Sequence, residues 1–183
     1  MQGLKHGSPT DVPQIASTLT DCATTAKRLQ LNADKTEVMW FGSAANLSKI
    51  PLANRTIRIG SDHVQQVTVV RDLGVMIDAE LSMRVHVSRT AQTCFYHLRR
   101  LRSIRGQLGR DVTARLVSAF VLSRLDYCNA VLAGLPASTV APFQRVLHAA
   151  ARFVLNLRPR DHVSAALREL HWLPVAQRID YKL

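Results

Sequence analysis

A helical repeat runs through Val87-Ser-Arg-Thr-Ala-Gln-Thr-Cys-Phe-Tyr-His-Leu-Arg-Arg-Leu101. Its apolar side chains recur at alternating spacings of four and three residues, at Val87, Ala91, Cys94, Leu98 and Leu101. This spacing is typical of an amphipathic α-helix that buries one face. Two glycines, Gly106 and Gly109, interrupt the pattern that follows. The stretch predicts one helix of a bundle, and the chain after Asp78 reads as helical to its end.

Four further helices are predicted downstream from similar stripes and from helix-ending residues. The second begins with Asp111 as its N-cap and is stopped by Gly134 and Pro136, and its stripe comprises Leu116, Phe120, Leu125 and Leu132. The third is capped by Ser138 or Thr139 and broken by Pro159, and its stripe comprises Phe143, Val146, Leu147, Ala150, Phe153 and Leu157. Asp161 opens a short fourth helix, and a last one starts after Pro174 and is expected to be truncated at Leu183.

The pattern changes upstream of Asp78. Residues 1–12 are expected to form an irregular lead-in, and apolar spacing predicts a helix from Pro13 to about Gln30. Short runs rich in β-branched and aromatic residues predict strands at 36–41, 56–59, 64–70 and 73–77, with a loop over 43–54. The predicted fold class is α+β, with a small antiparallel sheet and an N-terminal helix over 13–80 followed by a helical bundle over 81–183.

The charge balance is strongly basic. The 183 residues include 24 Lys and Arg against 13 Asp and Glu, which gives a formal net charge of +11. An excess of this size favours a polyanionic partner, with nucleic acid first and an anionic membrane surface second. The simpler alternative is a basic chain with no dedicated partner. The hydrophobic content of 47% is sufficient for one core or two small ones.

The cysteines and histidines predict neither a metal site nor a disulfide framework. Cys22, Cys94 and Cys128 are odd in number and never form a CxxC pair, and the histidines lack HxxxH spacing. A reducing compartment is therefore expected. The N-terminal residues have no apolar run typical of a signal peptide, and no stretch reaches the 18 to 20 apolar residues of a membrane span. The chain is predicted to be soluble and intracellular, without a membrane partner.

Four blocks of sequence carry a resemblance. They are Leu31–Gly42 (LNADKTEVMWFG), Val70–Asp78 (VRDLGVMID), Ser123–Ala130 with Leu132–Pro136 (SRLDYCNA, LAGLP), and a tail made of Arg160–His162, Leu170–Val175 (LHWLPV) and Arg178–Asp180. In this order they resemble reverse transcriptases of non-LTR (LINE) retrotransposons, particularly the Jockey and chicken-repeat group. The resemblance implies the last helix and strands of a polymerase palm, a primer-grip hairpin and a helical thumb.

The resemblance also indicates what this sequence lacks. Polymerase chemistry uses paired carboxylates to hold two divalent ions about 3.5 to 4 Å apart. In the family these carboxylates come from an early palm strand and from an aromatic-x-Asp-Asp turn, both N-terminal to the Leu31 block. The sequence holds no adjacent pair of aspartates. We therefore expect no polymerase activity from the chain alone and no bound cofactor, with Mg²⁺ expected only in the full-length enzyme.

Two residues acquire candidate roles through the resemblance. Lys35 matches the family lysine near the incoming triphosphate, where an ammonium can neutralise or protonate the leaving pyrophosphate. The alternative interpretation of Lys35 is a solvated lysine in a turn that leads to a strand. Gly74, in the predicted strand that runs from Leu73 to Asp78, is a primer-grip candidate because a strand glycine can mark a bulge or a close backbone approach. The alternative interpretation of this segment is an ordinary buried strand, and the two interpretations are compatible.

Arginines supply the candidate nucleic-acid contacts. Between Leu81 and Arg110 there are seven arginines and no acidic residue, and the predicted patch comprises Arg89, Arg99 and Arg100 with Arg102 or Arg105. Such a patch can contact phosphates and release counterions, and Tyr96 or Phe95, if exposed, can stack on a base. The alternative is a solvated helix face. A second basic cluster contains Arg145, Arg152, Arg158, Arg160 and Arg168, with Asp161 and Glu169 among them.

These observations favour a truncated retroelement product that binds RNA or an RNA–DNA duplex without sequence preference. A second hypothesis is a host-retained helical module that docks a protein partner, with self-association through exposed sheet or helix faces. A third is a pseudogene translation without a selected function. Asp126 and Tyr127 are predicted to make structural contacts and not catalytic ones.

Overall fold

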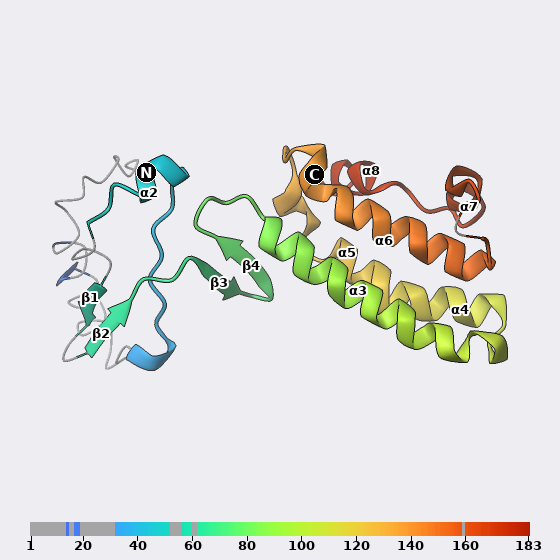
Figure 1. Ribbon diagram of the computed structural model, residues 1–183, viewed down its shortest axis with the longest axis horizontal. Helices are drawn as coiled ribbons and strands as arrows, with labels where there is room; N and C mark the ends of the chain where they lie inside the picture. Colours follow the sequence, from blue (N-terminus) through green and yellow to red (C-terminus); the bar gives the residue numbers. More distant parts are fainter. Residues whose placement is uncertain (1–13, 15–16, 19–31, 52–55, 60–61, 159) are drawn as a thin grey trace. The chain divides into compact units, whose positions relative to one another are not determined.

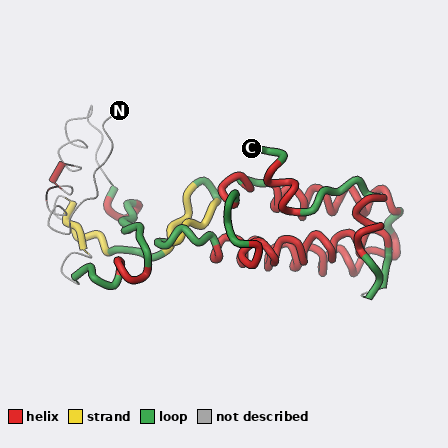
Figure 2. Tube along the Cα trace, turned by 90° about the horizontal axis from the view of Figure 1, so that it is seen from above, coloured by secondary structure: helices red, strands yellow, loops and turns green. Residues whose placement is uncertain are grey.

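The computed structural model describes residues 14, 17–18, 32–51, 56–59, 62–158 and 160–183. The chain divides into two compact units, Met1–Leu81 and Ser82–Leu183. The predicted α+β class is confirmed, because the first unit contains strands and the second is helical (Figures 1 and 2). The expected lead-in over 1–12 and the expected helix from Pro13 to about Gln30 lie outside the described residues, apart from Gln14, Ser17 and Thr18, which are helical.

The first unit contains two antiparallel hairpins. Strand β1 (Thr56–Ile59) pairs with β2 (Asp62–Gln65), and β3 (Val69–Asp72) pairs with β4 (Val75–Asp78). The single strand predicted over 64–70 is therefore wrong, because its two halves belong to different hairpins. The two halves separate at Gln66, which follows β2 of the first hairpin and forms an isolated parallel bridge with Val38.

The strand predicted over 36–41 is also wrong, because the described structure has only this single bridge in that range. Within the described residues, the segment is extended and pairs only at Val38, whose carbonyl also accepts a hydrogen bond from the Val67 N–H at 2.9 Å. A strand needs a neighbour along its length, and here the neighbouring chain turns away after one position. The loop expected over 43–54 also differs, because a short helix, α2 (Ala44–Leu47), forms within it.

The second unit is a helical bundle. Its long helices are α3 (Arg84–Ile104) and α6 (Ala137–Leu155), which pack side by side (Figure 1). Between them the chain forms α4 (Arg110–Val117), a π-helical segment (Ser118–Leu122), α5 (Ser123–Asp126) and a 3₁₀ turn (Asn129–Leu132). Two short helices follow, α7 (Val163–Glu169) and α8 (Val175–Asp180).

The predicted stripe of α3 is confirmed as the buried face of that helix. Val87, Ala91, Cys94, Leu98 and Leu101 are all buried. The stripe of α6 is confirmed from Phe143 to Phe153, and Phe143 and Leu147 are among the largest side chains that are completely buried. The period of about 3.6 residues thus identified both long helices and the core between them correctly.

The second predicted stripe is wrong in part, because the helix is not a uniform α-helix. The buried residues from Thr113 to Leu125 are Thr113, Val117, Val121, Leu122 and Leu125, of which all but Leu122 are spaced four apart, and Phe120 is exposed. Four-residue spacing drifts around a regular α-helix, but the wider π-helical turn at Ser118–Leu122 takes up the extra residue. The Cys94 thiol lies 3.8 Å from the Val121 carbonyl. Burial raises the pKa of Cys94 to about 11, so the thiol is protonated and donates.

The predicted N-caps are also wrong. Helix α4 follows Gly109, α6 follows Pro136 and α7 follows His162, and none of these helices has a side-chain cap. Asp161 makes a different contact, because its carboxylate accepts a hydrogen bond from the Arg158 N–H at 2.7 Å. Two of these helices are followed at their C-terminal ends by left-handed residues: Asn156 closes α6 and His171 follows α7, with positive φ angles of 54° and 55°.

A polar contact holds the last helix to the bundle. Arg178 of α8 forms a two-pronged ion pair with Asp126 of α5, in which its Nε donates to Oδ1 at 2.8 Å. Lys182 donates to the Asp126 carbonyl at 2.8 Å. The Val175 N–H, at the start of α8, donates to the Gln144 side chain of α6 at 2.9 Å. The structural role predicted for Asp126 is therefore confirmed.

Histidines should make the fold less stable in acid. Burial lowers the pKa of His86, and burial followed by the charge of Arg152 lowers the pKa of His148. The unfolded chain then binds more protons than the folded chain below the ordinary histidine value of 6.5, so the free energy of unfolding falls as pH drops through this range. Urea unfolding at constant ionic strength, from neutral pH to about pH 5, measures the slope.

The control for this prediction is His162→Gln, because His162 is exposed. The pH dependence should survive in this variant and become weaker in His86→Gln and in His148→Gln. A wild-type stability that stays flat or rises over the same range would contradict the assignment of these two histidines.

Candidate nucleic-acid interface

The net positive charge lies in the helical unit. Residues 82–183 hold 16 of the 24 Lys and Arg and five of the 13 Asp and Glu, whereas residues 1–81 hold eight of each. The whole excess of +11 therefore belongs to the second unit. Three of its five acids already have partners, because Asp126 binds Arg178, Glu169 binds Arg110 at 2.5 Å and Asp161 binds the Arg158 N–H. An anion approaching this unit meets mostly cations.

Helix α3 presents four of the five predicted arginines to solvent. Arg89, Arg99, Arg100 and Arg102 are exposed, and the helix contains no acidic residue. Arg89 and Arg100 are eleven residues apart and share one face, because three turns of an α-helix take about eleven residues. Arg99 and Arg102 are three apart and form a second row, about 120° around the helix from the first. The predicted patch is thus two separate rows on one helix.

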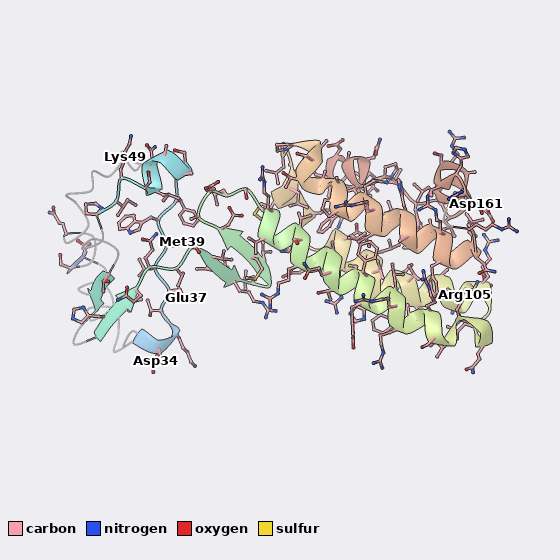
Figure 3. The ribbon with its side chains drawn as sticks, viewed as in Figure 1. Asp34, Glu37, Met39, Lys49, Arg105 and Asp161 are labelled. Carbon is pink, nitrogen blue, oxygen red and sulfur yellow. The ribbon has the colours of Figure 1, made fainter. Side chains whose placement is uncertain are left out.

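Arg105 does not belong to this patch. Its guanidinium donates to the carbonyls of Phe153 at 3.3 Å and Val154 at 3.1 Å, in the last turn of α6, and to Leu108 at 2.9 Å. It also lies 5.9 Å from the centre of the Phe153 ring. Figure 3 shows this side chain beside the C-terminal end of α6. Arg105 therefore caps the negative end of a neighbouring helix, and its predicted role in binding is replaced by a structural one.

The second basic cluster includes two acidic residues, Asp161 and Glu169, and one of its arginines makes a contact within the fold. Arg152 is half-buried and donates to the Asp161 carbonyl at 3.3 Å, while Arg145, Arg158, Arg160 and Arg168 are exposed. A cavity of about 320 Å³ lies nearby, between the end of α6 and α7. The two arginines that line this cavity already have partners, because Arg105 donates to backbone carbonyls and Arg110 forms an ion pair with Glu169. This region therefore offers less unbalanced charge than α3.

The two candidates in the first unit lie in turns. Lys35 is exposed at the end of a 3₁₀ turn (Ala33–Lys35), which fits a solvated lysine. The register of Asp72 opposite Val75 leaves Leu73 and Gly74 as a two-residue turn, and their φ angles of 43° and 88° are both left-handed. Gly74 is therefore not a strand residue, because a turn of this type favours glycine at its second position. Its prediction as a strand glycine is wrong.

Exposed aromatic rings lie next to the arginine rows. The rings of Tyr96 and His97 on α3 meet edge to face at 5.6 Å. The His97 ring stacks on Phe120 of the π-helical segment at 5.5 Å, with 22° between the planes. Burial, followed by the charge of Arg124, lowers the pKa of His97, which favours the neutral ring. The sequence indicated Tyr96 or Phe95, and both are exposed. Tyr96 contacts the His97 ring, whereas Phe95 lies on the row of Arg99 and Arg102. Phe120 was assigned to the core.

No protein-family model, curated protein or solved structure matches this chain. Among the described residues, no group of three or more His, Cys, Asp or Glu side chains is arranged to hold a metal ion. No helix in the described ranges combines the length and apolar character needed to cross a lipid bilayer.

Proposed function

We propose that this chain is the palm end and thumb of a retrotransposon reverse transcriptase, and that it binds RNA or RNA–DNA duplexes without sequence preference. The observation that carries the binding proposal is the acid-free helix α3, with Arg89, Arg99, Arg100 and Arg102 exposed in two rows. The ancestry is supported by the four blocks of sequence that resemble the LINE enzymes.

The spacing of the arginines suits a phosphate backbone. Arg89 and Arg100 are separated by about 16 Å along α3, at 1.5 Å per residue. Phosphates of one duplex strand follow each other at about 3.4 Å of axial rise, so this row spans about five of them. Arginine binds phosphate through a planar fork of donors, and such contacts do not depend on the base sequence. The row therefore fits duplex binding without sequence readout.

The proposed function separates binding from polymerisation. Two-metal chemistry needs closely paired carboxylates, and the sequence has no adjacent aspartates. Lys35 is exposed in its turn, where an ammonium without a bound triphosphate has no reaction to serve. We therefore assign the chain by itself a binding activity only.

The test combines a binding titration and a primer-extension assay on the same preparation. Affinity for an RNA–DNA duplex should fall steeply with salt, with a logarithmic slope of roughly −0.9 for each phosphate contacted. No nucleotide should be incorporated with Mg²⁺ or Mn²⁺. Incorporation that is lost in Lys35→Ala would refute the claim of inactivity, and absence of binding at low salt would refute the binding proposal.

Sedimentation with and without a short duplex separates this function from a protein-docking module. A duplex-dependent increase in sedimentation supports nucleic-acid binding. Self-association that is the same with and without the duplex would instead favour a module that uses its apolar faces to bind protein.

A further inference from the structure

The three rings of Tyr96, His97 and Phe120 form a surface that the duplex-binding function leaves unexplained. Tyr96 is 49% exposed and Phe120 is 41% exposed. One face of Phe120 stacks on His97, and the rest of its exposed ring is open to solvent. His97 lies between the other two rings. We call these three rings the aromatic ladder.

The π-helical segment is the reason that Phe120 lies outside the core. Val117 and Val121 on either side are completely buried, while Phe120 points to solvent and reaches His97 on α3. A turn of this kind lowers the quality of helical hydrogen bonding and is often found at functional sites. Exposing a large apolar ring also loses the stabilisation that burial would give. Both features favour a role for the exposed ring.

Cations flank the aromatic ladder. Arg124 and Arg100 each follow a ladder ring by four residues, Phe120 and Tyr96 respectively, so each lies one turn away from its ring. Both arginines are exposed. Arg124 is close enough to His97 for its charge to oppose protonation of that ring. The nearby carboxylate of Asp126 is bound by Arg178. The ladder is thus a neutral stacking surface with positive charge beside it.

We propose that the aromatic ladder is a stacking site for an unpaired nucleobase, with Arg100 and Arg124 contacting the phosphates on either side of it. Any base offers a flat face to a ring, so the stacking tolerates all four bases and adds no sequence preference. Paired bases inside a duplex do not expose this face. The site therefore selects nucleic acid in which a single-stranded segment adjoins a duplex, and this inference rests on the proposed function.

The experiment compares two probes that share one RNA–DNA duplex. One probe is blunt, and the other carries a short single-stranded extension with a fluorescent adenine analogue whose emission is quenched by stacking. Wild-type protein should bind the extended probe about fivefold or more tightly than the blunt one, because one stacked base contributes at least that factor. The analogue should be quenched on binding.

Phe120→Leu should abolish both the advantage of the extended probe and the quenching while keeping the affinity for the blunt duplex. Leucine retains an apolar side chain but removes the ring. Tyr96→Leu, at an exposed position, should act in the same direction if the first variant folds poorly. Phe95→Leu is the matched control, because Phe95 is 38% exposed on the same helix and lies on the row of Arg99 and Arg102.

The outcomes separate this inference from the proposed function. Equal affinity for the two probes, or an advantage that persists in Phe120→Leu, overturns the stacking site while duplex binding still stands. Failure to bind either probe at low salt overturns both. An advantage that Phe95→Leu abolishes as strongly as Phe120→Leu also overturns the assignment to the aromatic ladder.

Discussion

The variant Arg89→Ala, Arg99→Ala, Arg100→Ala and Arg102→Ala should bind a nucleic-acid duplex roughly several hundredfold more weakly than wild type. Each exposed guanidinium contributes about 1 kcal/mol as a charged donor to phosphate, which is about fivefold in affinity. The slope of log affinity against log salt should become shallower by about 0.9 for each phosphate contact removed. Fluorescence anisotropy over a salt series measures both quantities.

A matched variant removes the same charge elsewhere in the helical unit. Arg115, Arg145, Arg160 and Arg168 are also exposed, and their replacement with alanine should have a much smaller effect on the salt slope. Equal losses in the two variants would show that affinity follows net charge alone, and the interface on α3 would then be wrong. Double variants of Arg89 with Arg100 and of Arg99 with Arg102 would divide the effect between the two rows.

Arg105→Ala should instead destabilise the helical unit by roughly 2 kcal/mol, with little effect on duplex affinity in the folded protein. The side chain donates three hydrogen bonds to backbone carbonyls, two of them at the end of α6. Its loss leaves these carbonyls without a charged donor and removes a cation over the Phe153 ring. Urea unfolding measures the change in free energy.

Arg102→Ala provides the opposite control, because it removes an arginine from the same stretch without removing a cap. It should weaken duplex binding severalfold and change the free energy of unfolding by less than about 0.5 kcal/mol. Arg105→Lys should restore little stability, since an ammonium lacks the planar fork that reaches two carbonyls. If the Arg105→Ala protein is as stable as wild type but binds duplexes weakly, Arg105 belongs to the interface and its structural role is wrong.

Periodicity predicted the long helices well because one buried face determines them. The stripes from Val87 to Leu101 and from Phe143 to Phe153 needed no knowledge of their partners. The hairpins were harder, because register and turn type determine where a short strand ends. Gly74 followed a leucine and not the asparagine or aspartate that commonly precedes glycine in such turns, so its turn was read as a strand.

The errors at the candidate interface have a different cause. Arg105 was grouped with its neighbours because its partners, Phe153 and Val154, lie 48 and 49 residues later in the chain. Phe120 was placed in the core because no local residue preference marks a π-helical turn. One signal was available in the sequence, since Thr113, Val117, Val121 and Leu125 recur every four residues. A repeat that is slightly too long for an α-helix indicates such a turn.

The extra residue in the π-helical turn also determines how this gene can change by insertion and deletion. Loss of one codon from Ser118–Leu122 would remove the extra residue and leave Thr113 and Leu125 eleven positions apart, which is about three turns of a regular α-helix. Leu125 would then stay on the buried face, and Asp126 would still face Arg178. Loss of a second codon would rotate all that follows by about 100° and take Leu125 out of the core.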